Sequence, residues 1–484
     1  MRRFFAKNLL FVIAINLLVK PLWIFMIDRT VQNKVGHASY GIYQALFNLG
    51  IIFNILLDFG ISNYNSRTIS QFPRKLKALF PAMLSARLVL SVVYLSLVIA
   101  VALLLGYRGW QIIMLGGVLV FQSLSSMLMF IRSNISGLHK FKTDGVLSIA
   151  DRALMIVVCG FLLVFPPTAA SFKIEWFVIA QMVCYAIAVL IGLIVLKKIS
   201  DVRLRFSLDV KRIGLIIKQS FPYALLIFLM SVYTRADTLL VERISGTNGS
   251  VHAGIYAAAY RLLDVGNMIG LMFASMLLPV FGRMIAKRDN VQPIVQLCVN
   301  ILLPTSILVA VAGVCFSDEI MQLLYRHAGA ADAAVFTWLM VAFPAFCLSN
   351  VYSTLLTANG DLKLLNRLAL FGVVINLTLN LVLIPRYQSL GAAFTACITQ
   401  SILAIGFMVF AQQQMQLPRN VKWSMSFATF LVLVAAIGYS VQMLPIHWMV
   451  QAGLLFTSGI LLIFLFKFIS VGPIKQLLNK DQLK

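Results

Sequence analysis

Residues 88–105 read LVLSVVYLSLVIAVALLL, an uncharged and largely apolar stretch between Arg87 and Gly106. About 20 residues of this character form a helix long enough to cross the hydrocarbon core of a membrane. Apolar runs separated by charged breaks recur along the chain and predict an all-α polytopic membrane protein of about 14 transmembrane helices. The predicted helices cover residues 8–27, 40–63, 78–105, 110–131, 145–165, 175–196, 213–240, 252–282, 292–316, 333–357, 364–385, 389–412, 423–444 and 447–470.

The composition of the chain excludes a soluble globular enzyme. Of the 484 residues, 61% are hydrophobic and only 12% are charged. Soluble domains are nearer about half apolar and about a quarter charged. The residues left between the predicted helices are too scattered to form a separate soluble domain.

The net charge of +24 is distributed in a pattern typical of membrane proteins. Most Lys and Arg residues fall in every second connection between predicted helices, above all in the segment 197–212. Cytoplasmic loops of membrane proteins carry an excess of Lys and Arg, so these connections and both termini are predicted to be cytoplasmic. We therefore do not interpret the basic charge as a nucleic-acid-binding surface. Membrane lipids with anionic head groups are the expected partners of these residues.

The basic segment 197–212 also divides the predicted helices into six before it and eight after it. We predict that it links an N-terminal six-helix lobe, residues 1–196, to a second six-helix lobe, residues 213–412. Two additional transmembrane helices are expected within residues 423–470, followed by a cytoplasmic tail at residues 471–484.

Two short sequence echoes indicate that the lobes are related. The sequence HASYGIY at 37–43 resembles HAGIY at 252–256, and GLHK at 137–140 resembles GDLK at 360–363. In each pair the second copy lies six helices after the first, which gives both copies the same orientation in the membrane. The lobes are therefore predicted to be pseudo-symmetric.

Motifs for nucleotide hydrolysis, metal binding and nucleophilic catalysis are absent from the sequence. The six cysteines lie in or at the ends of predicted helices and have no metal-binding spacing. We therefore expect no catalytic residue, no metal and no cofactor. A membrane glycosyl polymerase is disfavoured, because such an enzyme usually needs a sizeable catalytic loop and the predicted outer loops are short.

Several polar and charged side chains fall inside the predicted helices. A charge near the bilayer centre costs about 2.5–3.5 kcal/mol on insertion scales and normally faces a partner or a water-filled cavity. Basic groups suit an anionic head group, amides can bond sugar hydroxyls, and carboxylates can couple a proton or cation. The residues predicted to bind substrate in a hydrated central cavity are Lys20, Arg87, Arg235, Arg261, Gln44, Asn48 and Tyr260. The residues predicted to couple an ion are Asp58, Asp237 and Asp264.

Internal ion pairing is the alternative interpretation of these charges. Arg261 and Asp264, one turn apart, could neutralise each other on their own helix. Asp58 lies close enough to the cytoplasmic end of its helix to reach the membrane interface.

Three parts of the chain resemble bacterial polysaccharide-export flippases. They are GIY at 41–43 with LLDFGI at 56–61, GIYAAAYR at 254–261, and the run from Ile375 to Phe394, in which Asn376 and Asn380 precede Ile384-Pro385. The family is the O-antigen and exopolysaccharide flippase branch of the multidrug/oligosaccharidyl-lipid/polysaccharide exporter superfamily. Arg261, Asp264 and Asp58 lie on or beside the resembling segments, whereas Lys20, Arg87, Arg235 and Asp237 lie outside them.

The resemblance implies two six-helix lobes around a cavity that opens alternately to the two sides of a bacterial inner membrane. It implies an undecaprenyl-pyrophosphate-linked oligosaccharide as cargo, such as a repeat unit of O-antigen, capsule or exopolysaccharide, moved from the cytoplasmic to the periplasmic leaflet. The polysaccharide polymerase machinery would then be a partner. A peptidoglycan lipid-precursor flippase and a multidrug or cation antiporter remain alternatives.

Overall fold

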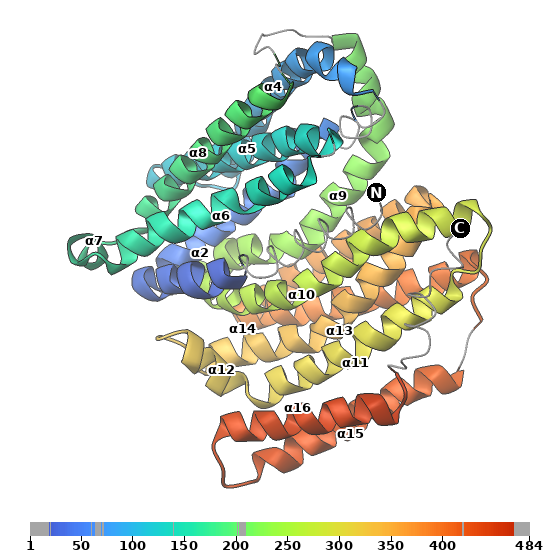
Figure 1. Ribbon diagram of the computed structural model, residues 1–484. Helices are drawn as coiled ribbons and strands as arrows, with labels where there is room; N and C mark the ends of the chain where they lie inside the picture. Colours follow the sequence, from blue (N-terminus) through green and yellow to red (C-terminus); the bar gives the residue numbers. More distant parts are fainter. Residues whose placement is uncertain are drawn as a thin grey trace. The chain divides into compact units, whose positions relative to one another are not determined.

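The computed structural model describes residues 19, 21–59, 61, 62, 69, 72–138, 140–200, 202, 210–418 and 421–468. Every regular element in these residues is a helix, and 12 helices are long and apolar enough to cross a membrane (Figure 1). The prediction of an all-α polytopic membrane protein is confirmed.

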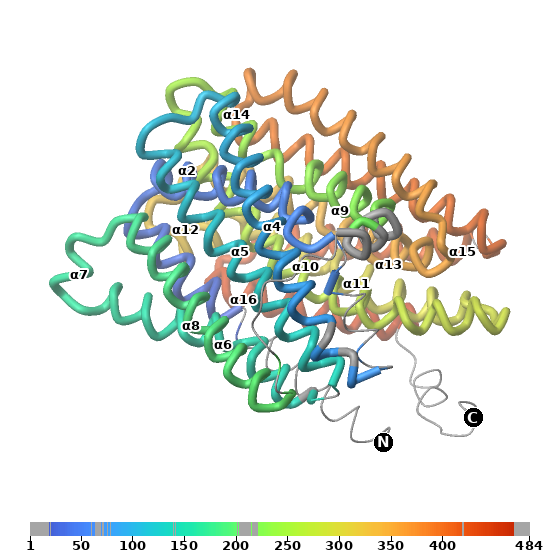
Figure 2. The backbone as a smooth tube through the Cα atoms, turned by 90° about the horizontal axis from the view of Figure 1, so that it is seen from above, coloured from blue at the N-terminus to red at the C-terminus, as the bar shows by residue number. Residues whose placement is uncertain are grey.

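The long helices are α2 (Arg29–Phe53), α4 (Leu76–Leu104), α5 (Trp110–Gly137), α6 (Phe141–Val164), α8 (Ile174–Ser200), α9 (Val210–Ile244), α10 (Gly249–Ala286), α11 (Gln292–Cys315), α13 (Ala330–Asn359), α14 (Leu362–Gln414), α15 (Val421–Gln442) and α16 (Trp448–Leu465). The short ones are η1 (Trp23–Asp28), η2 (Asn54–Leu57), η3 (Pro73–Lys75), α7 (Pro166–Ala170), η4 (Gly246–Asn248) and α12 (Ser317–Leu324). In both backbone views α7 lies at the turn between α6 and α8 (Figures 1 and 2).

From the second prediction onward each predicted helix corresponds to an observed one, although the second, predicted for residues 40–63, ends with η2 at Leu57, and the last, predicted for residues 447–470, ends at Leu465. The predicted helices 364–385 and 389–412 both lie in α14, whose backbone breaks at Gln388 (φ 54°, ψ −128°). Most of the first predicted helix, residues 8–27, lies outside the described residues. Its described end continues through η1 into α2 and turns at Gly36 (φ 78°, ψ 170°), a backbone conformation that glycine adopts without a steric penalty.

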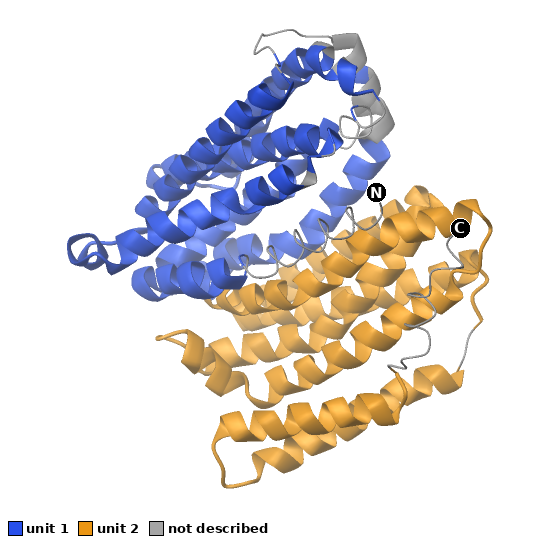
Figure 3. Ribbon diagram, viewed as in Figure 1, with its two compact units in different colours: residues 1–254 blue, residues 255–484 orange. Residues whose placement is uncertain are grey.

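The chain divides into two compact units, residues 1–254 and 255–484 (Figure 3). In the first unit α5 and α6 pack on α8, and α2 packs along α9. Aromatic side chains fill this core, as where the Trp23 ring stacks on Phe177 with centroids 5.8 Å apart.

The second unit is built on the packing of α13 with α14 and with α11. The C-terminal helices α15 and α16 pack on each other and on α11. Close packing here depends on small residues: a Cβ at Gly459 would overlap the Leu308 side chain.

The helix α9 belongs to the first compact unit, whereas the predicted lobes assign it to the second lobe. The predicted lobe boundaries at residues 1–196 and 213–412 therefore stay a prediction.

Candidate functional site

The structure describes nine of the ten predicted site residues, and Lys20 lies outside the described residues. Each compact unit contains a subset of them. The first unit contains Gln44, Asn48, Asp58, Arg87, Arg235 and Asp237, and the second contains Tyr260, Arg261 and Asp264. The central cavity that would unite them stays a prediction.

Arg87 is built into the interior of the first unit, where only 2% of its surface is exposed. It lies on α4 and forms an ion pair with Asp58, at the end of η2. One guanidinium nitrogen donates to the carbonyl oxygen of Ser126 at 2.9 Å and to its hydroxyl at 2.8 Å. The guanidinium also lies 5.0 Å from the ring centroid of Phe130. A buried charge needs partners of this kind, and these contacts tie α4 to the end of η2 and to α5.

A chain of hydrogen bonds follows the polar face of α2. The Gln44 amide donates to the Tyr40 hydroxyl at 2.8 Å, and that hydroxyl donates to Asp28 Oδ2 at 2.7 Å. Asp28 is 3% exposed and lies at the end of the π-helix η1. π-Helical turns are frequent at functional sites, and Asn48, one turn beyond Gln44, extends the same polar face.

Sequence reasoning missed Asp28 and Tyr40 as members of this site. Asp28 looked like the polar end of a first helix that stops at residue 27. The spacing of four between Tyr40 and Gln44, which places both on one helical face, was the available signal.

The polar residues of α9 lie on a helix that packs along α2. Phe53, at the end of α2, meets Phe228 of α9 with ring centroids 5.7 Å apart. Further along α9, Asp237 is 1% exposed and Arg235 is half-buried, and both have interaction partners. The α2–α9 pair thus holds most of the predicted site residues of the first unit.

In the second unit the polar residues follow α10. The Tyr256 and Tyr260 rings stack with centroids 5.6 Å apart, and Arg261 and Asp264 are half-buried beside them. One turn further, the Asn267 side-chain oxygen accepts a hydrogen bond from Asn350 of α13 at 2.7 Å. Aromatic, basic, acidic and amide groups therefore lie along less than four turns of one membrane-spanning helix.

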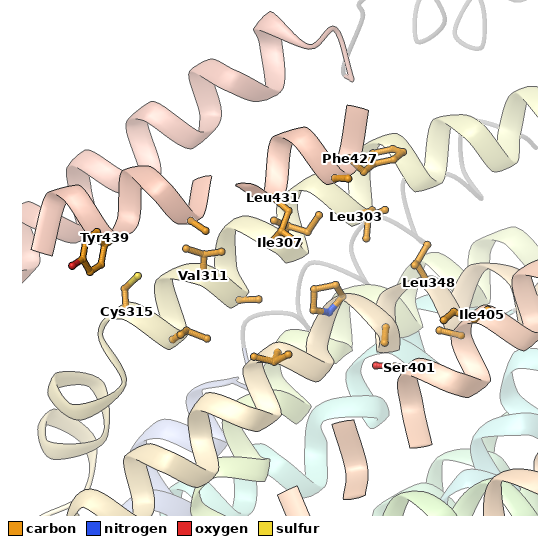
Figure 4. Close-up of a pocket in the computed structure, with 18 of the residues that line it drawn as sticks. Leu303, Ile307, Val311, Cys315, Leu348, Ser401, Ile405, Phe427, Leu431 and Tyr439 are labelled. Atoms are coloured by element: carbon orange, nitrogen blue, oxygen red, sulfur yellow. The ribbon is translucent and has the colours of Figure 1, made fainter. Parts of the chain in front are cut away.

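The second unit also contains an apolar pocket of about 670 Å³ among α11, α13, α14 and α15 (Figure 4). Its lining includes Leu303, Ile307, Leu348, Ile405, Phe427 and Leu431. A hydrocarbon chain suits such a wall, because only a few polar groups, such as those of Ser401 and Tyr439, reach it. No cluster of three or more His, Cys, Asp or Glu side chains that could hold a metal ion occurs in the described part of the chain.

Membrane-spanning helices with buried polar faces and an apolar pocket are typical of membrane transport proteins. The family model described as polysaccharide biosynthesis protein matches residues 5–285, more than half of the chain, and the chain belongs to that family. A second family model, MatE, matches residues 222–382. A search of curated proteins finds no match.

Solved structures of transporters share the fold. The lipid II flippase MurJ in an inward closed conformation matches with a TM-score of 0.69 at 15% identity, covering 95% of this chain and 98% of that one. An inward-facing multidrug resistance MATE family transporter of the MOP superfamily matches with a TM-score of 0.62 at 15% identity, covering 83% and 94%. The Vibrio cholerae MATE transporter VcmN, as a mutant, matches with a TM-score of 0.60 at 12% identity, covering 86% and 97%. The fold of this chain is thus the fold of solved flippases and transporters.

Proposed function

We propose that the protein is a flippase for an undecaprenyl-pyrophosphate-linked oligosaccharide, a repeat unit of O-antigen, capsule or exopolysaccharide. The observation that carries the proposal is the match of residues 5–285 to the polysaccharide biosynthesis family. The cargo moves from the cytoplasmic to the periplasmic leaflet of a bacterial inner membrane by alternating access, with both termini cytoplasmic. The two lobes at residues 1–196 and 213–412 are the moving parts, and the polysaccharide polymerase machinery receives the product.

The polar faces supply groups for the head group of this cargo. Arg235 and Arg261, with Lys20, suit the pyrophosphate, because guanidinium groups bond phosphate oxygens in a bidentate manner. The amides of Gln44 and Asn48 suit sugar hydroxyls. The ring of Tyr260, which already stacks on Tyr256, offers an apolar face to a sugar ring.

The same membrane-spanning helices supply room for the lipid. The apolar pocket of the second unit has the volume and lining for part of a polyprenyl chain. A chain of isoprene units is shielded from water both in the pocket and in the bilayer. Moving it from the bilayer into the pocket therefore has no large energetic cost.

In this proposal the acidic residues bind the proton or cation whose movement is coupled to transport. Asp237 and Asp264 lie in membrane-spanning helices, where carboxylates are expensive unless they serve a pathway or a partner. Asp58 is paired with Arg87, so binding of a proton or cation at Asp58 would compete with an existing ion pair.

A peptidoglycan lipid-precursor flippase is the second candidate. The fold match to MurJ over 95% of this chain favours it, because both cargoes combine a polyprenyl pyrophosphate with sugars. The MatE match at residues 222–382 favours a drug or cation antiporter as a third. The basic groups at Arg235 and Arg261 suit anionic cargo better than the cations such antiporters carry.

Deletion of the gene in its host separates the three candidates. The proposal predicts that a complete lipid-linked repeat unit accumulates on the cytoplasmic side while surface polysaccharide is lost. Accumulation of the peptidoglycan precursor instead would support the second candidate. Normal surface glycan with altered sensitivity to drugs or cations would contradict the proposal and support the antiporter.

A further inference from the structure

A buried tyrosine lies in the turn between α4 and α5. The turn reads Gly106-Tyr107-Arg108-Gly109, and both glycines have positive φ, 85° and 53°. A tyrosine in a short turn between two membrane-spanning helices is ordinarily half in water, yet Tyr107 is 0% exposed. Something other than its own turn must therefore cover it.

The cover is the C-terminal end of α9. The Tyr107 hydroxyl donates to Glu242 Oε2 at 2.8 Å. The guanidinium carbon of Arg243 lies 3.3 Å from the centroid of the Tyr107 ring, and its Nε lies 2.9 Å from the same Glu242 oxygen. The Glu242 side chain is only 7% exposed, so its charge depends on these two partners.

The three side chains form a single closed cluster. Tyr107 is held between a carboxylate at its hydroxyl and a cation on its ring face, an arrangement in which each contact orients the other two. Burial raises the pKa of Tyr107 far above its ordinary value, and the neighbouring Glu242 carboxylate raises it further. The phenol therefore remains protonated and remains a donor.

This cluster connects α9 to the turn between α4 and α5, two parts of the chain whose main packing partners are other helices. The helix α9 packs chiefly along α2, while α4 and α5 pack on each other. The cluster is therefore an additional contact, between the end of α9 and the turn that joins α4 to α5, beyond these helix interfaces. The Trp110 indole differs, because it donates at 2.7 Å to Glu175 of α8, the helix on which α5 already packs.

The cluster also joins the two predicted lobes at one end. The turn at 105–109 belongs to the first lobe, and α9 belongs to the second. Both the turn and the C-terminal end of α9 are predicted to lie on the outer side of the membrane. The turn at Gly36, also predicted to face outward, begins the part of α2 that meets residues 250–254. Besides the packing of α2 along α9, the two lobes thus meet at two connections that are predicted to lie on the outer side.

We propose that Tyr107, Glu242 and Arg243 form a latch that holds the outer ends of the lobes together, and that the outward-open state requires its release. This inference rests on the proposed alternating-access function. The latch supplies an outer closure that binds no cargo, so it can be tested without knowing what the protein carries.

A reporter cysteine at Asn48 tests the latch. Asn48 is 6% exposed and follows Gly41 by seven residues, so it lies on the face of α2 that meets the segment 250–254. The variant Asn48→Cys is treated from the outside, in spheroplasts, with a membrane-impermeant methanethiosulfonate. The chain without this substitution, which keeps its six cysteines, gives the background labelling.

Tyr107→Phe removes a hydrogen bond to a charged group, and Glu242→Gln keeps an acceptor but removes the charge that strengthens the bond and pairs with Arg243. We expect each to raise the labelling rate of the reporter by about tenfold. The double variant should add little to either single one, because both act on the same contact. Trp110→Phe is the matched control and should leave the rate unchanged, because its hydrogen bond lies within one lobe. The amount of each variant in the membrane is measured alongside.

Unchanged labelling in both latch variants at normal membrane levels would overturn the proposal. Equal acceleration by Trp110→Phe would also overturn it, because the effect would then be general loosening of the outer end. The labelling experiment needs no cargo, so its result is independent of the proposed function. If the latch variants are labelled faster but deletion of the gene leaves surface glycan intact, the latch is supported and the proposed cargo is contradicted.

Discussion

The backbones of Gly41 and Gly254 meet so closely that neither position has room for a side chain. A Cβ at Gly41 would overlap the carbonyl oxygen of Ser250, and a Cβ at Gly254 would overlap the carbonyl oxygen of His37. The two glycines occupy matching positions in the sequence echoes GIY at 41–43 and GIY at 254–256. The contact is therefore reciprocal, as a local twofold relation between two repeats requires. This reciprocity supports the predicted internal repeat.

Alanine at either glycine should separate the two segments. In an exposed helix Gly→Ala stabilises by up to about 1 kcal/mol, but overpacking a close contact costs about 1–3 kcal/mol. We expect Gly41→Ala and Gly254→Ala to lower the thermal unfolding temperature in detergent and to speed labelling of Asn48→Cys from outside. Gly116→Ala on α5 is the control, because its Cβ would meet nothing within 4 Å and the change should be neutral or stabilising. Equal behaviour of the three variants would contradict the close contact.

The ion pair between Arg87 and Asp58 should contribute mainly to stability. Arg87 is the buried partner, at 2% exposure against 30% for Asp58, so removal of Asp58 leaves a buried charge without compensation, which costs about 3–5 kcal/mol. Asp58→Asn should therefore destabilise the protein strongly, and adding Arg87→Met should recover a large part of the loss. Thermal unfolding of the purified variants measures both effects. A fully stable Arg87→Met variant that has lost transport would instead identify Arg87 as a substrate-binding residue.

Arg261 should be required for transport and not for insertion. We expect Arg261→Ala to reduce the flux of lipid-linked oligosaccharide at least about 100-fold, since a desolvated phosphate would lose a charge-assisted partner worth about 1.5–3 kcal/mol or more. Arg283→Ala, an exposed position near the end of the same helix, should transport normally. Membrane levels of both variants, read on immunoblots, should match the unsubstituted protein. Wild-type flux in Arg261→Ala would remove Arg261 from the proposed site.

Filling the apolar pocket should slow cargo with a long lipid chain. Leu431 lines the pocket, while Val432, the next residue of α15, is 65% exposed and does not line it. We expect Leu431→Trp to lower the transport rate by about tenfold, as the loss of apolar contact worth about 1.4 kcal/mol would do. Val432→Trp should have little effect. If the two variants transport equally well, the pocket does not hold the lipid.

The helices were predictable because a run of about 20 apolar residues has one stable form in a bilayer. The end of the first helix was placed too early in the chain, at residue 27, since polar residues such as Asn33 and Lys34 looked like a loop and instead continue the helix as far as the turn at Gly36. Hydropathy marks where a helix meets water, and it does not distinguish the last helical turn from the connection that follows.

The site was harder to predict than the helices, because partners lie far apart in sequence. Arg87 looked like a cavity residue, whereas its ion pair with Asp58 depends on how α4 packs. Tyr107 lay in a Gly-Tyr-Arg-Gly turn, which is typical of an exposed loop, and only the end of α9 buries it. The apolar pocket had no sequence signal, because its lining has the same composition as a surface that faces lipid.

Transport by the purified protein in liposomes tests the central claim most directly. The protein is reconstituted with a fluorescent polyprenyl-pyrophosphate oligosaccharide in the inner leaflet, and appearance of the sugar outside is followed with an enzyme that acts only there. We predict protein-dependent flipping that Arg261→Ala abolishes and Arg283→Ala preserves, with no flipping of an ordinary phospholipid. Flipping at the rate of protein-free liposomes, under conditions in which the protein is folded and an ion gradient of either polarity is imposed, would contradict the account.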